Sequence, residues 1–528
     1  MTDQPTGGGL NGAQALIRTL VDAGVDTCFT NPGTSEMHFV AALDTVPEMR
    51  AVLGLFEGVV TGAADGYARM ADRPAATLLH LGPGLGNGLA NLHNARKART
   101  PVVNIVGDHA TYHKQYDAQL ESDIETVARN VSPGWVRFSA APGEVGRDAA
   151  DAVAAASAPP GEVATLVLPA DVSWLDGGVV APPVAARPRS APDADAVEAV
   201  AKALRSGEPT CLFLGGSAMR ERSLVAASRT AAATGATLLC ETFPARHERG
   251  AGIPDVARLA YLAEFAADQL SGLRHLVLVD AKSPVSFFAY PGKASDLVPD
   301  GCQVHVLAAP DQDAPGALEA LADLLGAPAG GAARPAPELP DLATGPLTAE
   351  AVARAVGALL PEGAIVSEEA NTSSLFLPGF TAGSPRHDWL SLTGGAIGQG
   401  MPVATGAAVA CPDRKVISLE ADGSALYTIQ SLWTQAREGL DVTTVIFNNR
   451  SYAILNMELG RVGAGAGGPR ARDLLDLSRP DIDFVSISEG LGVPATRATT
   501  AEEFAEQFRH ALAEPGPRLV EAMVTRVL

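Results

Sequence analysis

Two polar residues lie where neighbouring β-strands are predicted to end in the last third of the chain. Asp422 follows one predicted strand, and Asn449 follows the next. A right-handed β-α-β connection would bring both to the same edge of a parallel sheet, where open α/β sheets bind ligands. Carboxylate and amide oxygens suit Mg²⁺, and Gly423 with a helix start at Ser424 could approach a phosphate. The alternative is an ordinary Asp N-cap at a strand-end turn.

Three further segments carry residue types that could act on a bound ligand. Glu57 opens a predicted helix after a strand, and on its own it is a favourable first-turn charge. His80 ends another predicted strand, where an imidazole could move protons near neutral pH or could serve the structure alone. The glycine-rich segment 393–402 is, on its own, a strand-to-helix turn.

The elements expected to position these residues alternate along the chain. Short β-branched runs are followed by longer segments with helical periodicity, which is the pattern of parallel α/β sheets. We therefore predict an α/β fold with three doubly wound parallel-sheet domains. The predicted strands are residues 27–29, 52–55, 75–79, 210–215, 275–280, 364–367, 416–419 and 443–447. One helix is predicted to begin at Ser424 and to end at Gly439.

Two stretches rich in Pro, Gly and Ala divide the chain, at residues 176–195 and 327–346. Both lack apolar periodicity, which is typical of linkers. The predicted domains are therefore residues 8–175, residues 190–328 and residues 346–528.

The composition argues against several functional classes. The 528 residues carry a formal charge of −21, which does not suit a nucleic-acid partner. Apolar residues make up 47% and charged residues 19%, the balance of a well-buried globular protein. The five cysteines are scattered and form no Cys-x-x-Cys pair, so neither a zinc site nor a disulfide framework is expected. We expect no membrane span, no signal peptide and a cytoplasmic location.

Taken together, the motifs resemble those of thiamine-diphosphate-dependent enzymes. Asp-Gly-Ser at 422–424 followed by Asn-Asn at 448–449 looks like the family's diphosphate and metal motif, although Ala421 stands where the family usually has glycine. Residues 55–68 resemble the stretch around a glutamate that contacts the cofactor's aminopyrimidine ring. Residues 393–402 are similar to the loop under the cofactor. The resemblance implies thiamine diphosphate and Mg²⁺ as cofactors.

The resemblance also implies a role for each matching residue. Three oxygen ligands of Mg²⁺ are implied, namely Asp422, Asn449 and, through its backbone oxygen, Ser451. Glu57 would contact the pyrimidine nitrogen and so help the cofactor to lose its C2 proton. The carbonyl of Gly395 would accept from the cofactor's amino group, and Ile397 would bend the cofactor. Further cofactor contacts are implied for Gly33, Asn371, Gly423, Ser424 and Tyr452.

The substrate side of the pocket resembles that of benzoylformate decarboxylases. Thr34, in the loop 31–36, falls where those enzymes have a serine, and His80 falls on their pocket histidine, so both are candidates for catalysis. The adjacent His-His pair of pyruvate decarboxylases is absent, and Leu455 replaces their glutamate, so a simple pyruvate decarboxylase is not expected. Across nearly the whole chain, the similarity is greatest to actinobacterial acetolactate-synthase-large-subunit-like proteins.

The function implied is decarboxylation of a 2-oxo acid, after which the acyl carbanion equivalent is protonated or passed to a carbonyl acceptor. Two alternatives stay open: a carbon–carbon lyase of acyloins or 2-hydroxyacyl thioesters, and a non-catalytic cofactor-binding paralogue. The central segment has no convincing nucleotide fingerprint, so FAD is not expected. The family also implies a homodimer or homotetramer with active sites between subunits, and no nucleic-acid or membrane partner.

Overall fold

The computed structural model describes residues 9–330, 334–465 and 467–525. Residue 8 and residues 526–528, at the ends of predicted domains, and residues 331–333, in the second predicted linker, lie outside the described residues. The chain divides into two compact units, which are described separately. Unit 1 consists of Met1–Pro188, Gly394–Pro412 and Thr428–Leu440, and unit 2 consists of Arg189–Thr393, Asp413–Tyr427 and Asp441–Leu528.

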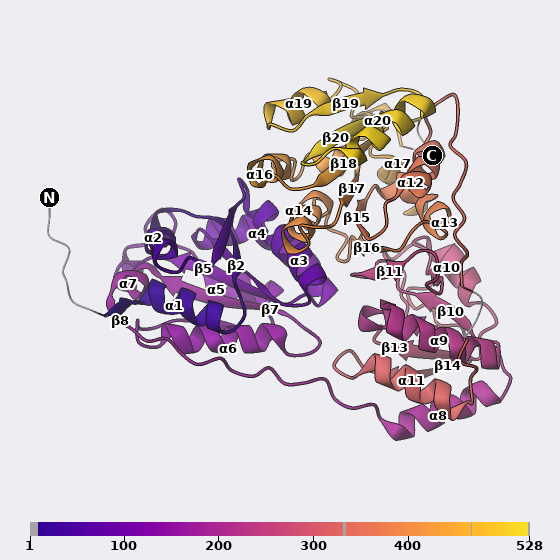
Figure 1. Ribbon diagram of the computed structural model, residues 1–528, viewed down its shortest axis with the longest axis horizontal. Coiled ribbons are helices and arrows are strands. Elements are labelled where there is room, and N and C mark those ends of the chain that lie inside the picture. The colour runs from indigo at the N-terminus through magenta and orange to yellow at the C-terminus, as the bar shows by residue number, and fades with distance from the viewer. Residues whose placement is uncertain (1–8, 331–333, 466, 526–528) are drawn as a thin grey trace. The chain divides into compact units, whose positions relative to one another are not determined.

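Unit 1 is built on a six-stranded parallel sheet in the order β3-β2-β4-β5-β7-β6. Its strands are β2 (Thr27–Asn31), β3 (Arg50–Leu53), β4 (Ala75–Leu79), β5 (Val102–Asp108), β6 (Val136–Phe138) and β7 (Val163–Pro169). Figure 1 labels β2, β5 and β7 of this sheet. Every residue of β4, β5 and β7 is buried, as expected for a parallel sheet covered on both faces. The helices α1 (Gly12–Asp22) and α6 (Val145–Ser157) share one apolar core with these strands.

The helix α3 (Glu57–Ala71) packs closely against α14 (Gly400–Ala410) within unit 1. A Cβ on Gly66 would lie 2.1 Å from the carbonyl oxygen of Val403, and one on Gly406 would lie 1.8 Å from that of Ala63. Glycine at both positions therefore permits the backbones of the two helices to meet. This contact fixes the beginning of α3 relative to the loop that precedes α14.

Unit 2 contains two further α/β sheets. The first is parallel, in the order β12-β10-β9-β13-β14, and the second has the order β11-β16-β15-β17-β18-β20-β19. The strands of the first are β9 (Thr210–Leu214), β10 (Thr237–Cys240), β12 (Ala257–Arg258), β13 (His275–Val279) and β14 (Gln303–Ala308). Those of the second are β11 (His247–Arg249), β15 (Ala364–Glu369), β16 (His387–Ser391), β17 (Val416–Ala421), β18 (Val442–Asn448), β19 (Ala495–Ala498) and β20 (Arg518–Met523).

Helices cover both sheets of unit 2 with apolar faces. The first sheet shares a core with α8 (Ala194–Arg205), α9 (Glu221–Thr234) and α11 (Ala314–Leu324), and a second core with α10 (Ala263–Leu270). The seven-stranded sheet packs on α12 (Ala349–Leu359) and α20 (Ala501–Ala513). The α/β class with parallel sheets is thus confirmed.

Two expectations from the sequence were wrong in detail. The seven-stranded sheet is not purely parallel, because β11 pairs antiparallel with β16, and β11 comes from the range predicted to form the central domain. The helix predicted to begin at Ser424 is interrupted: α15 (Asp422–Ala425) ends after one turn, and α16 (Ser431–Glu438) begins later and ends at Gly439 as expected. The chain passes from unit 2 to unit 1 at the break, where the Thr428 hydroxyl donates to the carbonyl of Gly398 at 3.0 Å.

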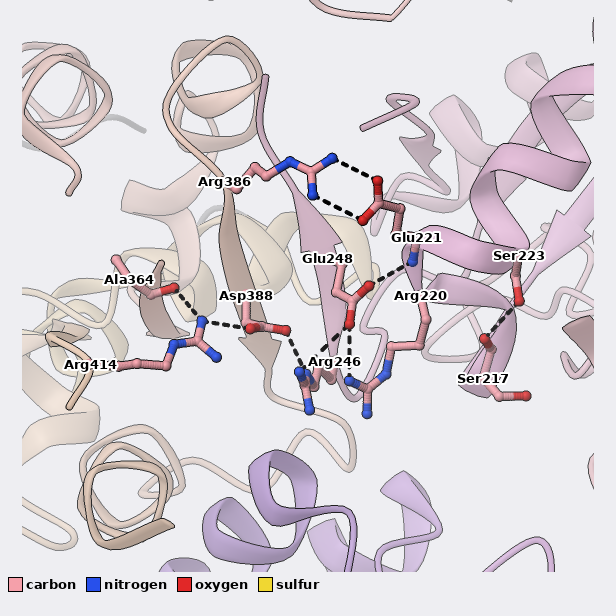
Figure 2. A network of polar contacts seen from close by, with 10 residues as sticks. All are labelled: Ser217, Arg220, Glu221, Ser223, Arg246, Glu248, Ala364, Arg386, Asp388 and Arg414. Atoms are coloured by element: carbon pink, nitrogen blue, oxygen red, sulfur yellow. Dashed lines mark hydrogen bonds and ion pairs between the residues drawn. The ribbon is translucent and has the colours of Figure 1, made fainter. Parts of the chain in front are cut away.

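Charged side chains secure β11 as the edge strand of the seven-stranded sheet (Figure 2). Arg246 Nε donates to Asp388 Oδ1 at 2.5 Å, and Arg414 Nη2 donates to Asp388 Oδ2 at 2.7 Å. Burial alone would raise the pKa of Asp388, but these two guanidinium groups hold it below its ordinary value. Arg386 forms a bidentate pair with Glu221 on α9, at 3.0 and 2.6 Å. The antiparallel pairing is therefore reinforced by ion pairs around Asp388, and a further ion pair joins Arg386 to the helix α9.

Two buried histidines accompany this pairing. His247 is 1% exposed, and burial holds its pKa well below 6.5. His387 donates from Nδ1 to a backbone carbonyl at 2.8 Å, and burial lowers its pKa to about 4. The guanidinium carbons of Arg249 and Arg258 lie 5.6 and 5.5 Å from the ring centroid of the neighbouring Trp389. Because burial lowers the pKa of both His247 and His387, both histidines are neutral in the folded protein at neutral pH.

Acid should destabilise unit 2 because these histidines resist protonation. The unfolded chain takes up a proton near pH 6.5 and folded His387 only near pH 4, so stability falls as the pH drops through this window. At about pH 5, His387 alone should cost about 2 kcal/mol of unfolding free energy. His387→Gln should therefore lose less stability than the wild type between pH 7.5 and about pH 5 in urea unfolding. The control His510→Gln alters an exposed histidine, and an equal pH dependence in all three proteins would contradict the prediction.

Among the residues that the structure describes, no helix has the length and apolar character needed to span a membrane.

Candidate functional site

In unit 2, Asp422 lies at the end of β17 and the loop 449–451 wraps around its carboxylate. The backbone N–H groups of Gly423 and Arg450 donate to Asp422 Oδ1 and Oδ2 at 2.8 and 2.6 Å. Within the same loop, Ser451 N donates to Asn449 Oδ1 at 2.9 Å. All three predicted metal ligands are at most 7% exposed. The predicted juxtaposition of Asp422 and Asn449 is therefore present.

The charge of Asp422 is held in a buried position. Burial raises the pKa of its carboxyl to about 6, although the surrounding backbone amides act in the opposite direction. A bound cation would relieve this cost of burying a carboxylate. No three His, Cys, Asp or Glu side chains gather as a metal centre anywhere in the described ranges. The arrangement therefore suits a hard cation that accepts one carboxylate together with amide and main-chain oxygens, as Mg²⁺ does.

Other predicted cofactor contacts surround this carboxylate in unit 2. A Cβ on Gly423 would lie 2.3 Å from the ring of Tyr452, so glycine is needed for the ring to pack there. The Ser424 hydroxyl donates to the backbone carbonyls of Ala421 and Glu369, at 3.1 and 3.4 Å. Asn371, in a left-handed conformation with φ +51°, donates from Nδ2 to the same Glu369 carbonyl at 3.1 Å. The ends of β15 and β17 are thus tied together beside Asp422.

In unit 1, Glu57 is the first residue of α3 and is 6% exposed. Its Oε2 accepts a hydrogen bond from Asn87 Nδ2 at 3.0 Å. On the other side, a Cβ on Gly84 would lie 3.2 Å from Glu57 Oε1. Both neighbours belong to α4 (Leu81–Ala98), which packs along α3. The carboxylate is therefore held in one orientation in a largely dry environment, which suits a proton-transfer role.

The glycine-rich loop predicted to underlie the cofactor lies next to Glu57 in unit 1. Asn91 Nδ2 donates both to the carbonyl of Gly58, at 2.7 Å, and to that of Gly398, at 3.0 Å. One amide therefore joins the residue after Glu57 to the residue after Ile397. Gly395 itself has φ +74°, a conformation that favours glycine.

A second amide holds the same loop. Asn94 Nδ2 donates to the Ala396 carbonyl at 2.8 Å, and Ala396 N donates to Asn94 Oδ1 at 3.2 Å. The paired bonds fix the backbone on either side of Gly395 and Ile397. Neither asparagine was identified from the sequence, because their partners lie about three hundred residues away and no local pattern reports them.

His80 directly follows β4 and pairs with a buried carboxylate. Its Nδ1 lies 2.8 Å from Glu36 Oε2, which also accepts from Gly33 N at 2.7 Å. Glu36 is 1% exposed, and a Cβ on Gly107 would lie 1.7 Å from its Oε1. Burial raises the pKa of Glu36, and the His80 ring opposes this only in part.

The pair gives His80 a fixed orientation. With Nδ1 held by Glu36, Nε2 is the ring nitrogen that can exchange a proton with a ligand. Thr34 begins the short turn η1 (Thr34–Glu36) directly after Gly33 and is exposed. The contact between His80 and Glu36 therefore brings two of the predicted catalytic candidates, Thr34 and His80, to one edge of the sheet. Glu36 was not singled out from the sequence, although it lies within the loop 31–36.

Replacing Glu36 with glutamine should lower kcat by about tenfold or more, because the neutral amide no longer stabilises one tautomer of His80. The double variant Glu36→Gln/His80→Gln should be no slower than His80→Gln alone, since Glu36 acts through His80. Steady-state kinetics of the three variants measure this, with the exposed Glu144→Gln as the control. Additive losses in the double variant would show that Glu36 acts independently.

Family models match both ends of the chain. Residues 10–128 match the thiamine pyrophosphate enzyme N-terminal TPP-binding domain, and residues 373–522 match the C-terminal TPP-binding domain of the same family. The first match contains Glu57 and His80, and the second contains Asp422 and Asn449. The chain belongs to the thiamine-pyrophosphate-dependent enzymes.

Individual relatives extend over nearly the whole chain. A Mycobacterium tuberculosis protein named "Putative acetolactate synthase large subunit IlvX" is 64% identical over 520 residues, covering 98% of this chain and 99% of the relative. Benzoylformate decarboxylase of Pseudomonas aeruginosa is 31% identical, with 94% and 96% covered. The solved structure of a thiamine-diphosphate-dependent 4-hydroxybenzoylformate decarboxylase from Rhodococcus jostii is 25% identical, with a TM-score of 0.84 over 98% of this chain and 99% of that one. The predicted resemblance is confirmed.

Proposed function

We propose that this enzyme decarboxylates a 2-oxo acid and then protonates the acyl carbanion equivalent or transfers it to a carbonyl acceptor. The observation that carries the proposal is the fixed His80–Glu36 pair in the same unit as buried Glu57. Two acid–base groups are needed, one to activate the cofactor and one to serve the reacting carbon. Named relatives that act on benzoylformate and 4-hydroxybenzoylformate support the substrate class.

Thiamine diphosphate supplies the electron sink for this chemistry when it is bound. The chain's residues then bind and orient it and move protons. Proposed catalytic residues are Glu57, His80 and Thr34; proposed cofactor contacts are Gly33, Gly395, Ile397, Asn371, Gly423, Ser424 and Tyr452; and proposed ligands of Mg²⁺ are Asp422, Asn449 and Ser451. We further propose a cytoplasmic homodimer or homotetramer with active sites between subunits.

The sheet of β9, β10 and β13 supports the proposal that the enzyme works without FAD. Asp280 Oδ2 accepts from the backbone N–H and the hydroxyl of Ser217, at 2.8 and 2.7 Å. A Cβ on Gly215 would lie 2.7 Å from the carboxyl carbon of Glu241. Two carboxylates thus crowd the turn at the strand ends, where a nucleotide's phosphates would otherwise meet backbone amides. The backbone N–H of Ser217 already donates to Asp280 and is therefore not available to a pyrophosphate.

A panel of substrates with thiamine diphosphate and Mg²⁺ tests the proposal. We expect CO₂ release from an aryl or alkyl 2-oxo acid, together with an aldehyde or a carbon–carbon ligation product in the same reaction. Cleavage of benzoin-type or 2-hydroxyacyl thioester substrates without any decarboxylation would replace the proposal with a lyase. Flavin absorbance in the purified protein would overturn the FAD-free assignment.

A further inference from the structure

The helix α17 (Ala453–Arg461) follows directly after the predicted metal loop. Its N-cap, Tyr452, packs its ring on Gly423, and the residue before that is the predicted ligand Ser451. Asn456, one turn into the helix, donates from Nδ2 to the Ser451 hydroxyl at 3.0 Å. Any displacement of α17 must therefore displace the loop that would hold Mg²⁺.

The far end of α17 is bound by the part of unit 2 that surrounds the five-stranded sheet. Arg461 Nη1 and Nη2 donate to Glu264 Oε1 and Oε2 on α10 at 3.2 and 2.8 Å. The guanidinium carbon of Arg461 also lies 4.7 Å from the ring centroid of Tyr290. Lys293 forms a further ion pair with Glu264 and lies over the same ring at 5.7 Å. A bidentate pair fixes the direction of the helix end as well as its distance.

A second acidic group lies one turn earlier on the same helix. Glu458 is 8% exposed, and its Oε2 lies 3.5 Å from Arg461 Nε. Burial raises the pKa of Tyr261 and Tyr290, and the charge of Glu458 adds to both effects. Buried carboxylates are costly unless they are paired. Arg461 belongs to the same helix as Glu458, so it is the interactions of Glu458 with Tyr261 and Tyr290 that link α17 to its surroundings.

The aromatic side of this environment is itself well packed. The ring of Tyr261 lies 5.3 Å from that of Phe287 and 6.4 Å from that of Phe243, and Phe243 and Phe287 meet edge to face at 5.9 Å. Aromatic pairs at such distances resist displacement. Tyr261, which interacts with Glu458 of α17, is therefore itself packed against neighbouring rings.

We propose that Glu264, Tyr290, Glu458 and Arg461 form a clamp that positions the metal loop through α17. In this enzyme the region around the five-stranded sheet would then serve cofactor binding by holding a helix. The inference rests on the proposed binding of thiamine diphosphate and Mg²⁺ in the C-terminal part of the chain. Arg461 is a positioning residue, because it acts through the helix and not on the ligand.

Amide hydrogen exchange of the protein without cofactor tests the clamp first. Arg461→Gln should exchange the amides of residues 452–461 about fivefold faster than the wild type, while the core strands β17 and β18 keep their rates. Arg222→Gln is the matched control, because it breaks an equally bidentate pair, with Glu319 at 2.8 and 2.7 Å, on the helices α9 and α11. Unchanged exchange of α17 in Arg461→Gln would overturn the clamp.

Cofactor binding, followed by quenching of tryptophan fluorescence during Mg²⁺ titration, provides the second measurement. Arg461→Gln should need several-fold more Mg²⁺ for half-saturation, Arg461→Lys should recover part of the loss, and Arg222→Gln should match the wild type. Equal midpoints in all proteins would overturn the clamp and leave the proposed function standing. A wild type that binds no thiamine diphosphate at any Mg²⁺ concentration would instead remove the proposed function.

Discussion

Replacing Glu57 with glutamine is expected to lower kcat by about 10²- to 10⁴-fold, the usual contribution of a positioned acid–base group. Glu57 is buried at the start of α3, where Asn87 fixes its Oε2 and Gly84 leaves room for its Oε1. Glutamine has nearly the same shape and can still accept from Asn87, so the fold and the helix should persist. The amide cannot hold or release the proton that the carboxylate exchanges.

The contrast between binding and turnover makes this test specific. Thiamine diphosphate and Mg²⁺ should bind Glu57→Gln with nearly wild-type affinity, because the proposed diphosphate and metal contacts lie elsewhere in the sequence. The exposed Glu48→Gln serves as the control for loss of a carboxylate in the same region. Exchange of the cofactor's C2 proton, followed by NMR, should slow in parallel with kcat. Glu57→Gln retaining more than about a tenth of wild-type kcat would refute the assignment.

Each strand predicted from the sequence overlaps a strand of the structure, but several buried strands, among them β5, β7 and β16, were not predicted. Gly, Asn or Asp after a β-branched run is a local signal of a strand end. The positions of Asp422 and Asn449 at neighbouring strand ends followed from the handedness of a single β-α-β connection. β4 begins and ends where the pattern predicted, and β17 and β18 differ by one or two residues. The α/β class and the cofactor family could therefore be predicted from such local patterns.

Contacts between segments that are distant in the sequence could not be predicted from it. His80 and Glu36 are 44 positions apart, and Asn91 and Gly398 are 307 apart. Each contact depends on how separate elements pack, which the periodicity of one element does not report. The pairing of β11 with β16 was missed for the same reason, since β11 has three residues and joins a sheet far along the chain. The break between α15 and α16 was missed because the apolar spacing continues across it.

Asp422→Asn is expected to abolish Mg²⁺-dependent binding of thiamine diphosphate at millimolar metal, with a loss of at least about 10²-fold in metal affinity. Both carboxylate oxygens of Asp422 accept backbone N–H groups, from Gly423 and Arg450. An asparagine must turn its NH₂ group toward one of these donors, which removes a hydrogen bond in a buried place as well as the negative charge. The loop around Asn449 should therefore lose both its anchor and its attraction for a cation.

The loss of metal affinity, compared with the loss of stability, distinguishes a metal ligand from a structural N-cap. If Asp422 only capped a turn, Asp422→Asn would keep cofactor affinity and cost little stability, since asparagine caps helices about as well as aspartate does. Asp413→Asn is the matched control, because Asp413 is exposed and precedes the opposite end of the same strand, β17. Calorimetric titration with Mg²⁺ at saturating thiamine diphosphate, together with urea unfolding of both variants, distinguishes the cases. A hard cation held by one carboxylate depends on that charge more than on any neutral ligand, so Asn449→Ala should weaken metal binding less than Asp422→Asn does.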